Sequence, residues 1–210
     1  MNGAVPQPHT LPSAVHHDYA GSKIAMWLFL FTEIILFGGL FLLYSAYRAK
    51  YPHEFHDGGN ELNYVIGVIN TLVLLTSSLS MAGSITALQK GGRRLAMLLV
   101  GVTVVLGAVF LVNKYFEWMV KFHHGLYPNG PELLKRPPGQ VLFFGLYFTM
   151  TGLHGLHVIA GMVLLSIMLV LLARSRIRQD DYGKLENAGL YWHLVDVIWI
   201  FLLPLFYLSA

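Results

Sequence analysis

Ionisable side chains are rare inside the long apolar stretches of this sequence, and five of them are candidates for a functional site. They are Glu33, His154, His157, His193 and Asp196. A charge at the centre of a bilayer costs at least about 2.5–3.5 kcal/mol, so such residues usually face the interior of a helix bundle and have a function. Histidine and carboxylate side chains can ligate iron or bind haem, and they can also carry protons. These residue types therefore allow either a metal centre or a proton-handling site.

The spacing of these residues favours bonding between helices. His154 and His157 are three residues apart and share one helix face, as do His193 and Asp196. A membrane histidine near glycine and other small residues most often bonds a neighbouring helix. We expect Glu33 to be a buried carboxylic acid that bonds His157 or His154. We expect His193 and Asp196 to bond each other or a partner subunit.

Depth along the helices argues against a shared metal site for the two glutamates of the apolar stretches. Glu33 lies about 13 Å from the inner end of the first stretch, whereas Glu117 lies about 33 Å along the third, at the outer face. Beside Trp118, Glu117 is expected to be an interfacial residue near an aromatic belt. Without Glu117, one glutamate, one aspartate and three histidines provide too few carboxylates for a ferritin-like di-iron centre.

Five apolar stretches, each long enough to cross a bilayer, carry these residues. They cover roughly residues 25–47, 62–88, 95–118, 141–173 and 190–208. A hydrocarbon core of about 30 Å needs about 20 apolar residues in a helix, whereas barrel strands would be about 10 residues long and alternating. The charged fraction of 12% is about half that of soluble domains. The sequence therefore predicts an all-α bundle of five transmembrane helices, of which the fourth is long enough to tilt or to project from the membrane.

The sequence divides into a polar N-terminal tail, residues 1–24, and a single five-helix domain, residues 25–210. The tail lacks the charged-then-apolar order of a secretory signal. Within the second apolar stretch, Ser80 and Ser84 form a small-xxx-small pair, which indicates close helix packing. Pro204 lies near the end of the last stretch, where a kink costs little.

The distribution of charge predicts how the chain is oriented in the membrane, and the lack of cysteine excludes some kinds of site. Eight Lys and Arg residues of the loops and flanks share the side of the N-terminus, against five on the other side. This excess predicts a cytoplasmic N-terminus and an external C-terminus. The net charge of +3 is small and spread over loops, so no nucleic-acid partner is expected. The absence of cysteine excludes disulfides and thiolate-ligated metal sites in this chain.

Three sequence segments carry a family resemblance. The first, residues 27–41, places Glu33 directly after a threonine, and the second, residues 151–161, contains His-Gly-Leu-His-Val. The third is Glu186 followed by Tyr-Trp-His-Leu-Val-Asp-Val in residues 191–197. In order and spacing they resemble subunit III of haem-copper oxidases. A leucine stands at position 194 where phenylalanine is usual. The larger family members have seven helices, and this chain resembles the five-helix bacterial form.

The resemblance implies an accessory, non-catalytic subunit of an oxidoreductase complex in the bacterial plasma membrane. It implies no cofactor in this chain, with haem and copper in partner subunits. Subunit I, subunit II and phospholipid are the expected partners, and a larger respiratory assembly is compatible with it. Family members stabilise the catalytic subunit and support proton uptake, and by position Glu33 matches the family's carbodiimide-reactive glutamate. The expected buried proton- or lipid-related residues are Glu33, His154, His157, Glu186, His193 and Asp196.

Other functions stay open on the sequence alone. A subunit III-like partner of nitric oxide reductase would share the same three segments. A b-type cytochrome or a di-iron enzyme would use His154 or His157 together with His193. A proton-coupled transporter would use Glu33. The electron donor of the oxidase, cytochrome c or quinol, is not encoded in these segments.

Overall fold

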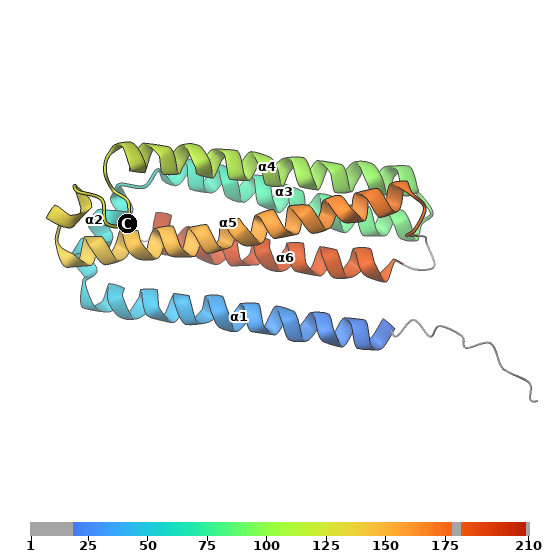
Figure 1. The fold of residues 1–210 in the computed structure, drawn as a ribbon, viewed down its shortest axis with the longest axis horizontal. Coiled ribbons are helices and arrows are strands. Elements are labelled where there is room, and N and C mark those ends of the chain that lie inside the picture. Colours follow the sequence, from blue (N-terminus) through green and yellow to red (C-terminus); the bar gives the residue numbers. More distant parts are fainter. Residues whose placement is uncertain (1–18, 178–181, 209–210) are drawn as a thin grey trace, which may run out of the picture.

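Five long helices lie side by side along the length of the molecule (Figure 1). The structure, a computed structural model, describes residues 19–177 and 182–208. The long helices are α1 (Tyr19–Lys50), α3 (Tyr64–Gln89), α4 (Arg93–His123), α5 (Pro138–Ala173) and α6 (Gly183–Leu203). Each is long and apolar enough to cross a membrane, and the described residues contain no strand. The predicted all-α bundle of five transmembrane helices is confirmed.

The predicted polar tail, residues 1–24, overlaps the start of the first helix. Residues 1–18 of the predicted tail lie outside the part of the chain that the structure describes, and α1 already begins at Tyr19.

At the end of the last span, α6 is followed by a π-helical turn, Pro204–Leu208. Pro204 has no backbone N–H to donate to the preceding turn, which accounts for the change of helical pitch at this position.

A short helix, α2 (Pro52–Asn60), connects the first two spans and was not predicted from the sequence. Pro52 fixes the backbone at the first helical position, and Phe55, Gly58 and Gly59 are buried. The glycine at position 58 allows a close approach to α5, because a Cβ there would lie 2.5 Å from Cδ1 of Phe143. A 3₁₀ turn follows α4, at Leu133–Lys135.

Polar contacts show which helix ends meet. At the end of the bundle where α1 begins, Arg93 donates from Nε to the Leu172 carbonyl at 2.7 Å and from Nη2 to the Ala173 carbonyl at 2.6 Å. These bonds join the start of α4 to the end of α5, whose last carbonyls have no partner within the helix. At the opposite end, Arg136 bonds the carboxylate of Glu61. The helices therefore alternate in direction, as the loop assignment from the sequence required (Figure 1).

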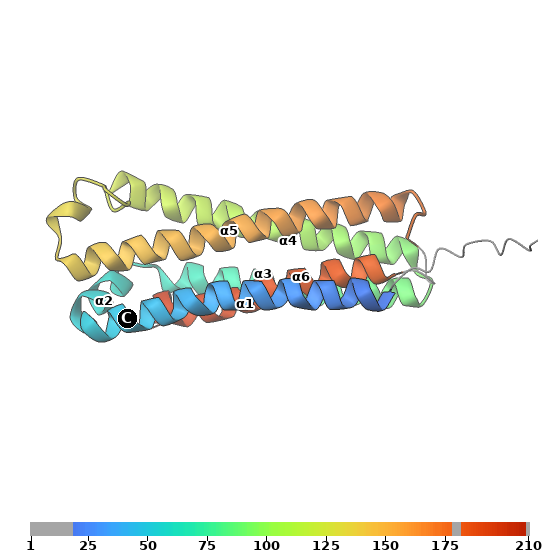
Figure 2. The same ribbon diagram turned by 60° about the horizontal axis from the view of Figure 1, so that its bottom comes forward.

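Four helices form the core, and α1 lies along its outside. In an apolar window of 18 residues, 11% of the α1 span is buried, against 50% of the span that contains α6. Figures 1 and 2 both show α1 at the edge of the bundle, next to α6. Within the core, Ser80 donates to the Leu99 carbonyl at 2.9 Å and joins α3 to α4. This contact confirms the close packing predicted for Ser80.

Candidate functional site

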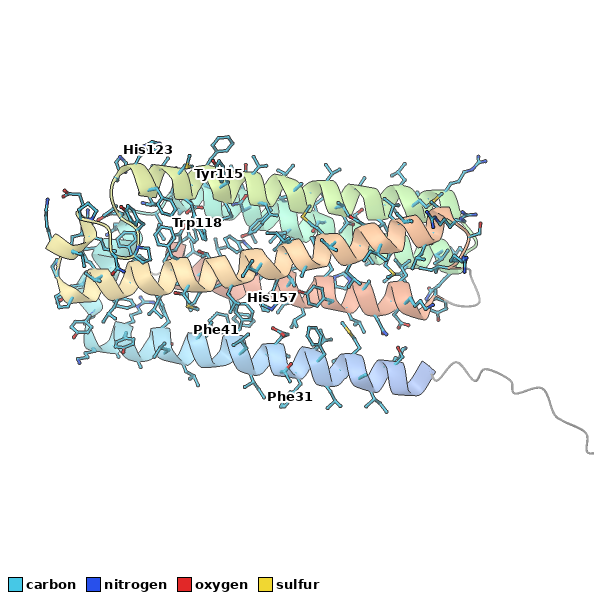
Figure 3. All side chains as sticks on the ribbon, in the orientation of Figure 1. Phe31, Phe41, Tyr115, Trp118, His123 and His157 are labelled. Carbon is cyan, nitrogen blue, oxygen red and sulfur yellow. The ribbon has the colours of Figure 1, made fainter. Side chains whose placement is uncertain are left out.

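Glu33 and His157 form the central polar contact between α1 and α5. His157 Nε2 and Glu33 Oε2 are 2.8 Å apart, and their side chains are only 16% and 14% exposed. Figure 3 shows His157 between the two helices. The Phe37 ring and the imidazole form a T-shaped contact, with ring centres 5.3 Å apart. The Glu33–His157 bond was one of the two alternatives predicted from the sequence.

The second imidazole nitrogen determines the chemistry of this pair. His157 Nδ1 lies 2.8 Å from the Leu153 carbonyl, which can only accept, so Nδ1 carries a hydrogen. The neutral ring then has a lone pair on Nε2, facing the Glu33 carboxyl. One proton is thus shared between Glu33 and Nε2, as an acid bonded to a neutral imidazole or as an ion pair. The contact between the two side chains therefore holds one proton.

His154 does not bond Glu33 or any other described residue. Its side chain is fully buried, and neither ring nitrogen has a hydrogen-bond partner in the part of the chain that the structure describes. It packs against Phe110 and Trp199, with ring centres 5.5 and 5.3 Å away. The expectation that this histidine bonds a neighbouring helix was wrong. The reason is that a three-residue step turns the side chain by about 60° on the helix, away from α1 and into the aromatic core.

His193 and Asp196 do not bond each other, which corrects a second expectation. His193 Nδ1 lies 2.6 Å from the Ser78 hydroxyl of α3. Asp196 is 2% exposed, and neither carboxylate oxygen has a hydrogen-bond partner among the described side chains and backbone.

Glu186, the last of the predicted site residues, lies at the end of the bundle. It forms an ion pair of 3.1 Å with Lys23 of α1, and both side chains are partly exposed. The adjacent Asn187 donates to the Ser22 hydroxyl at 3.0 Å. Glu186 therefore helps to attach α1 to α6, and it is not part of the buried Glu33 contact.

A buried charged cluster at the α2 end of the bundle was not predicted. Lys114 Nζ donates to Glu117 Oε2 at 2.9 Å, to the Tyr207 hydroxyl at 2.8 Å and to the Tyr147 hydroxyl at 3.1 Å. Both tyrosines in turn donate to Glu117 Oε1, at 2.8 Å from Tyr147 and 2.6 Å from Tyr207. All three hydrogens of the ammonium group are used.

Burial of this cluster corrects the interfacial position expected for Glu117. Glu117 is 6% and Lys114 7% exposed, so both are enclosed by the protein. The estimate of depth along the helix did not show which side of α4 faces the bundle. The signal was present in the sequence, since Lys114 and Glu117 are three residues apart and thus share a helix face.

The histidines do not converge on one site. His157 bonds α1, His154 packs against Phe110 and Trp199, and His193 bonds α3. In the described ranges, no group of three or more His, Asp and Glu side chains is placed to hold a metal ion. A haem or di-iron site built from His154 or His157 with His193 is not supported by this arrangement.

Fold and site together define a five-span membrane protein whose ionisable residues bond across helices. The family model for cytochrome c oxidase subunit III matches residues 135–210. Cytochrome c oxidase subunit 3 of Thermostichus vulcanus is 32% identical over 99% of this chain and 98% of its own length. Cytochrome bo(3) ubiquinol oxidase subunit 3 of Pseudomonas aeruginosa is 30% identical over 92% of this chain and 88% of its own. The chain belongs to the subunit III family of haem-copper oxidases.

Membership of this family makes the chain an accessory subunit of an oxidoreductase complex and a multi-pass protein of the bacterial plasma membrane. A further relative, named heme-copper oxidase subunit I+III, comes from Aeropyrum pernix. It is 28% identical over 94% of this chain, which corresponds to 24% of the relative. In that protein, by its name, the two subunits are joined in one polypeptide, so a catalytic subunit I is the partner that the family implies.

Proposed function

We propose that this chain is a cofactor-free, non-catalytic subunit III that binds beside subunit I, stabilises it during turnover and supports proton uptake. The observation that carries the proposal is the bond of 2.8 Å between Glu33 and His157, two ionisable side chains inside membrane spans, which supports a proton-related role for this pair. A carboxyl group bonded to an imidazole can hold and release a proton near neutral pH. The joined I+III relative supports a fixed one-to-one arrangement of the two subunits.

Glu33 and His157 are the residues to which we assign the proton-related role. Their contact lies between the loosely packed α1 and the core, so the proton is close to the surface of the subunit and to its surroundings. His193, Asp196 and His154 have other neighbours and receive no part in this step. Glu186 supports it indirectly, by holding α1 against α6 through Lys23.

Phospholipid and subunit II complete the proposed set of partners. A cavity of about 350 Å³ lies between α1, α5 and α6 and is lined by apolar side chains that include Met26, Phe29 and Leu164. Such a cavity fits part of an acyl chain. We further propose that residues 25–210 act as one domain with the N-terminus in the cytoplasm, because the positive loops share that side. The electron donor is set by the partner subunits, since relatives are named for both cytochrome c and ubiquinol.

The test compares the oxidase purified with this chain and without it. Oxygen consumption is followed over many turnovers, together with the visible spectrum. We expect an unchanged haem spectrum and initial rate without the chain, but earlier loss of activity during turnover. Loss of the haem spectrum and of all activity from the first turnover would contradict the accessory role. Restoring the chain as Glu33→Gln then tests the proton function, for which slower proton uptake is expected at unchanged recovery of the complex.

A further inference from the structure

A polar group lies at mid-membrane on the face formed by α3 and α6. His193 is ten residues after Gly183, the first residue of α6, and therefore about 15 Å along that helix. Ser78 is eleven residues before Gln89, the last residue of α3, at about 16 Å from the same end. Both side chains are half-buried, and they bond each other across the two helices. The contact is thus close to the centre of a hydrocarbon core of about 30 Å.

The hydrogen bonds of this group are incomplete within the chain. His193 Nδ1 bonds Ser78, but Nε2 bonds none of the residues that the structure describes. Asp196, one turn further along α6, is buried with both oxygens unpartnered. Unsatisfied polar groups are costly in lipid, where no water replaces the missing partner. Asp196 is enclosed by the chain, whereas Nε2 of the half-buried His193 is open to a partner from outside it.

The unused Nε2 of His193 can bond a partner in either tautomer of the ring. Nδ1 lies 2.6 Å from the Ser78 hydroxyl, which can donate or accept. Where Nδ1 donates to Ser78, Nε2 presents a lone pair, and where Nδ1 accepts from Ser78, Nε2 carries the hydrogen. In both cases one polar side chain placed against Nε2 completes the hydrogen bonds of the ring.

The surroundings of His193 are apolar and exposed, as expected for a surface between membrane helices. Leu79 of α3 is 75% exposed, and Val197 of α6, one turn after His193, is 45% exposed. On other outward faces the hydroxyls bond their own helix, as Ser45 does to the Phe41 carbonyl at 2.9 Å. Serine bonded in this way needs nothing from its surroundings. The α3–α6 face differs because its half-buried imidazole has a nitrogen, Nε2, that bonds none of the described residues.

Given the proposed function, we infer that a transmembrane helix of the catalytic subunit packs on the α3–α6 face around His193 and that a polar side chain of that helix hydrogen-bonds its Nε2. A phospholipid is a poorer occupant, because its ester and phosphate groups lie at the interface, about 15 Å from this depth. A protein helix can place a polar side chain at mid-membrane, where interhelical hydrogen bonds are formed. The relative that joins subunits I and III in one chain supplies the one-to-one partner.

Photo-crosslinking in intact membranes tests the position of this face. p-Benzoylphenylalanine is placed at position 79 or 197 of the tagged chain, in the presence of the complete oxidase. Position 105 is the control, because Val105 is 62% exposed on α4 and lies twelve residues, or about 18 Å, along that helix. We expect positions 79 and 197 to crosslink to the catalytic subunit and position 105 to give background only.

The hydrogen bond is tested by substitution of His193. His193→Leu should lower the ratio of catalytic subunit to tagged chain about 3- to 10-fold under stringent detergent, whereas His193→Gln, which keeps polar atoms, should lose less. Crosslinks from positions 79 and 197 to lipid, to a second copy or to nothing, while the catalytic subunit co-purifies, would overturn the assignment. Equal recovery of the Leu and Gln variants would overturn the hydrogen bond. If the unaltered chain recovers no catalytic subunit, the proposed function itself fails, and the assignment with it.

Discussion

Breaking the Lys114–Glu117 pair should destabilise the subunit far more than breaking an exposed pair of the same spacing. The cluster buries one ammonium and one carboxylate with every ammonium hydrogen bonded. Lys114→Met removes the only cation that contacts Glu117 within the described cluster and leaves the carboxylate enclosed. Removing one partner of a buried pair costs about 3–5 kcal/mol. For a chain of this size, that corresponds to a fall of about 6–20 °C in the melting temperature.

The double variant separates the charge effect from simple loss of packing. Glu117→Gln alone leaves the ammonium uncompensated and should be similarly destabilising. Lys114→Met combined with Glu117→Gln removes both charges, so its cost should be smaller than the sum of the two single costs by at least about 2 kcal/mol. Thermal unfolding in mild detergent, followed by size-exclusion chromatography of the heated samples, gives the three melting temperatures.

An exposed pair provides the control for this experiment. Lys135 and Glu132 are also three residues apart and 2.7 Å from each other, but their side chains are 69% and 57% exposed. Lys135→Met should cost less than about 1 kcal/mol. Equal effects of Lys114→Met and Lys135→Met, or additive effects in the double variant, would refute the reasoning from burial.

Two further predictions concern the carboxyl site and the core. Glu33 should react faster with carbodiimide in His157→Leu, because its acid group is no longer held by the imidazole, and at an unchanged rate in His154→Leu. Mass spectrometry of the labelled chain measures both rates. Equal rates in the two variants would contradict the assignment. Gly107→Ala should lower the stability of the chain by about 1–3 kcal/mol, measured by thermal unfolding, since the new methyl group would lie 2.7 Å from a ring carbon of Trp192. Gly101→Ala on the same helix is the control, because a methyl group there meets nothing within 4 Å. No difference between these two alanine variants would contradict the packing.

The sequence predicted the spans well because transmembrane helices depend on a local property, a run of apolar residues of sufficient length. It also predicted the bond between Glu33 and one histidine of α5, since a lone carboxyl in a span has few possible partners. The choice between His157 and His154 depended on the rotation of α5 relative to α1. That rotation is a tertiary feature, and sequence spacing alone did not determine it.

The failed expectations share one physical cause. His193 bonds Ser78, because packing of α6 against α3 places this serine between the two helices. Asp196 bonds neither His193 nor Ser78. The cluster around Lys114 depends on Tyr207, which the π-helical turn after Pro204 brings into the bundle. Such contacts join residues 90 or more positions apart, so local patterns could not reveal them. The short helix α2 was missed because its nine residues carry no long apolar run.

Purification of the complex tests the central claim most directly. The chain is tagged, extracted in mild detergent and recovered with whatever remains bound, and both the complex and the separated chain are analysed by visible spectroscopy and mass spectrometry. We predict that a haem- and copper-containing catalytic subunit co-purifies and that the separated chain is colourless. A chain that is recovered alone and carries its own haem or iron would contradict the account, and its intramembrane histidines would then have to be ligands.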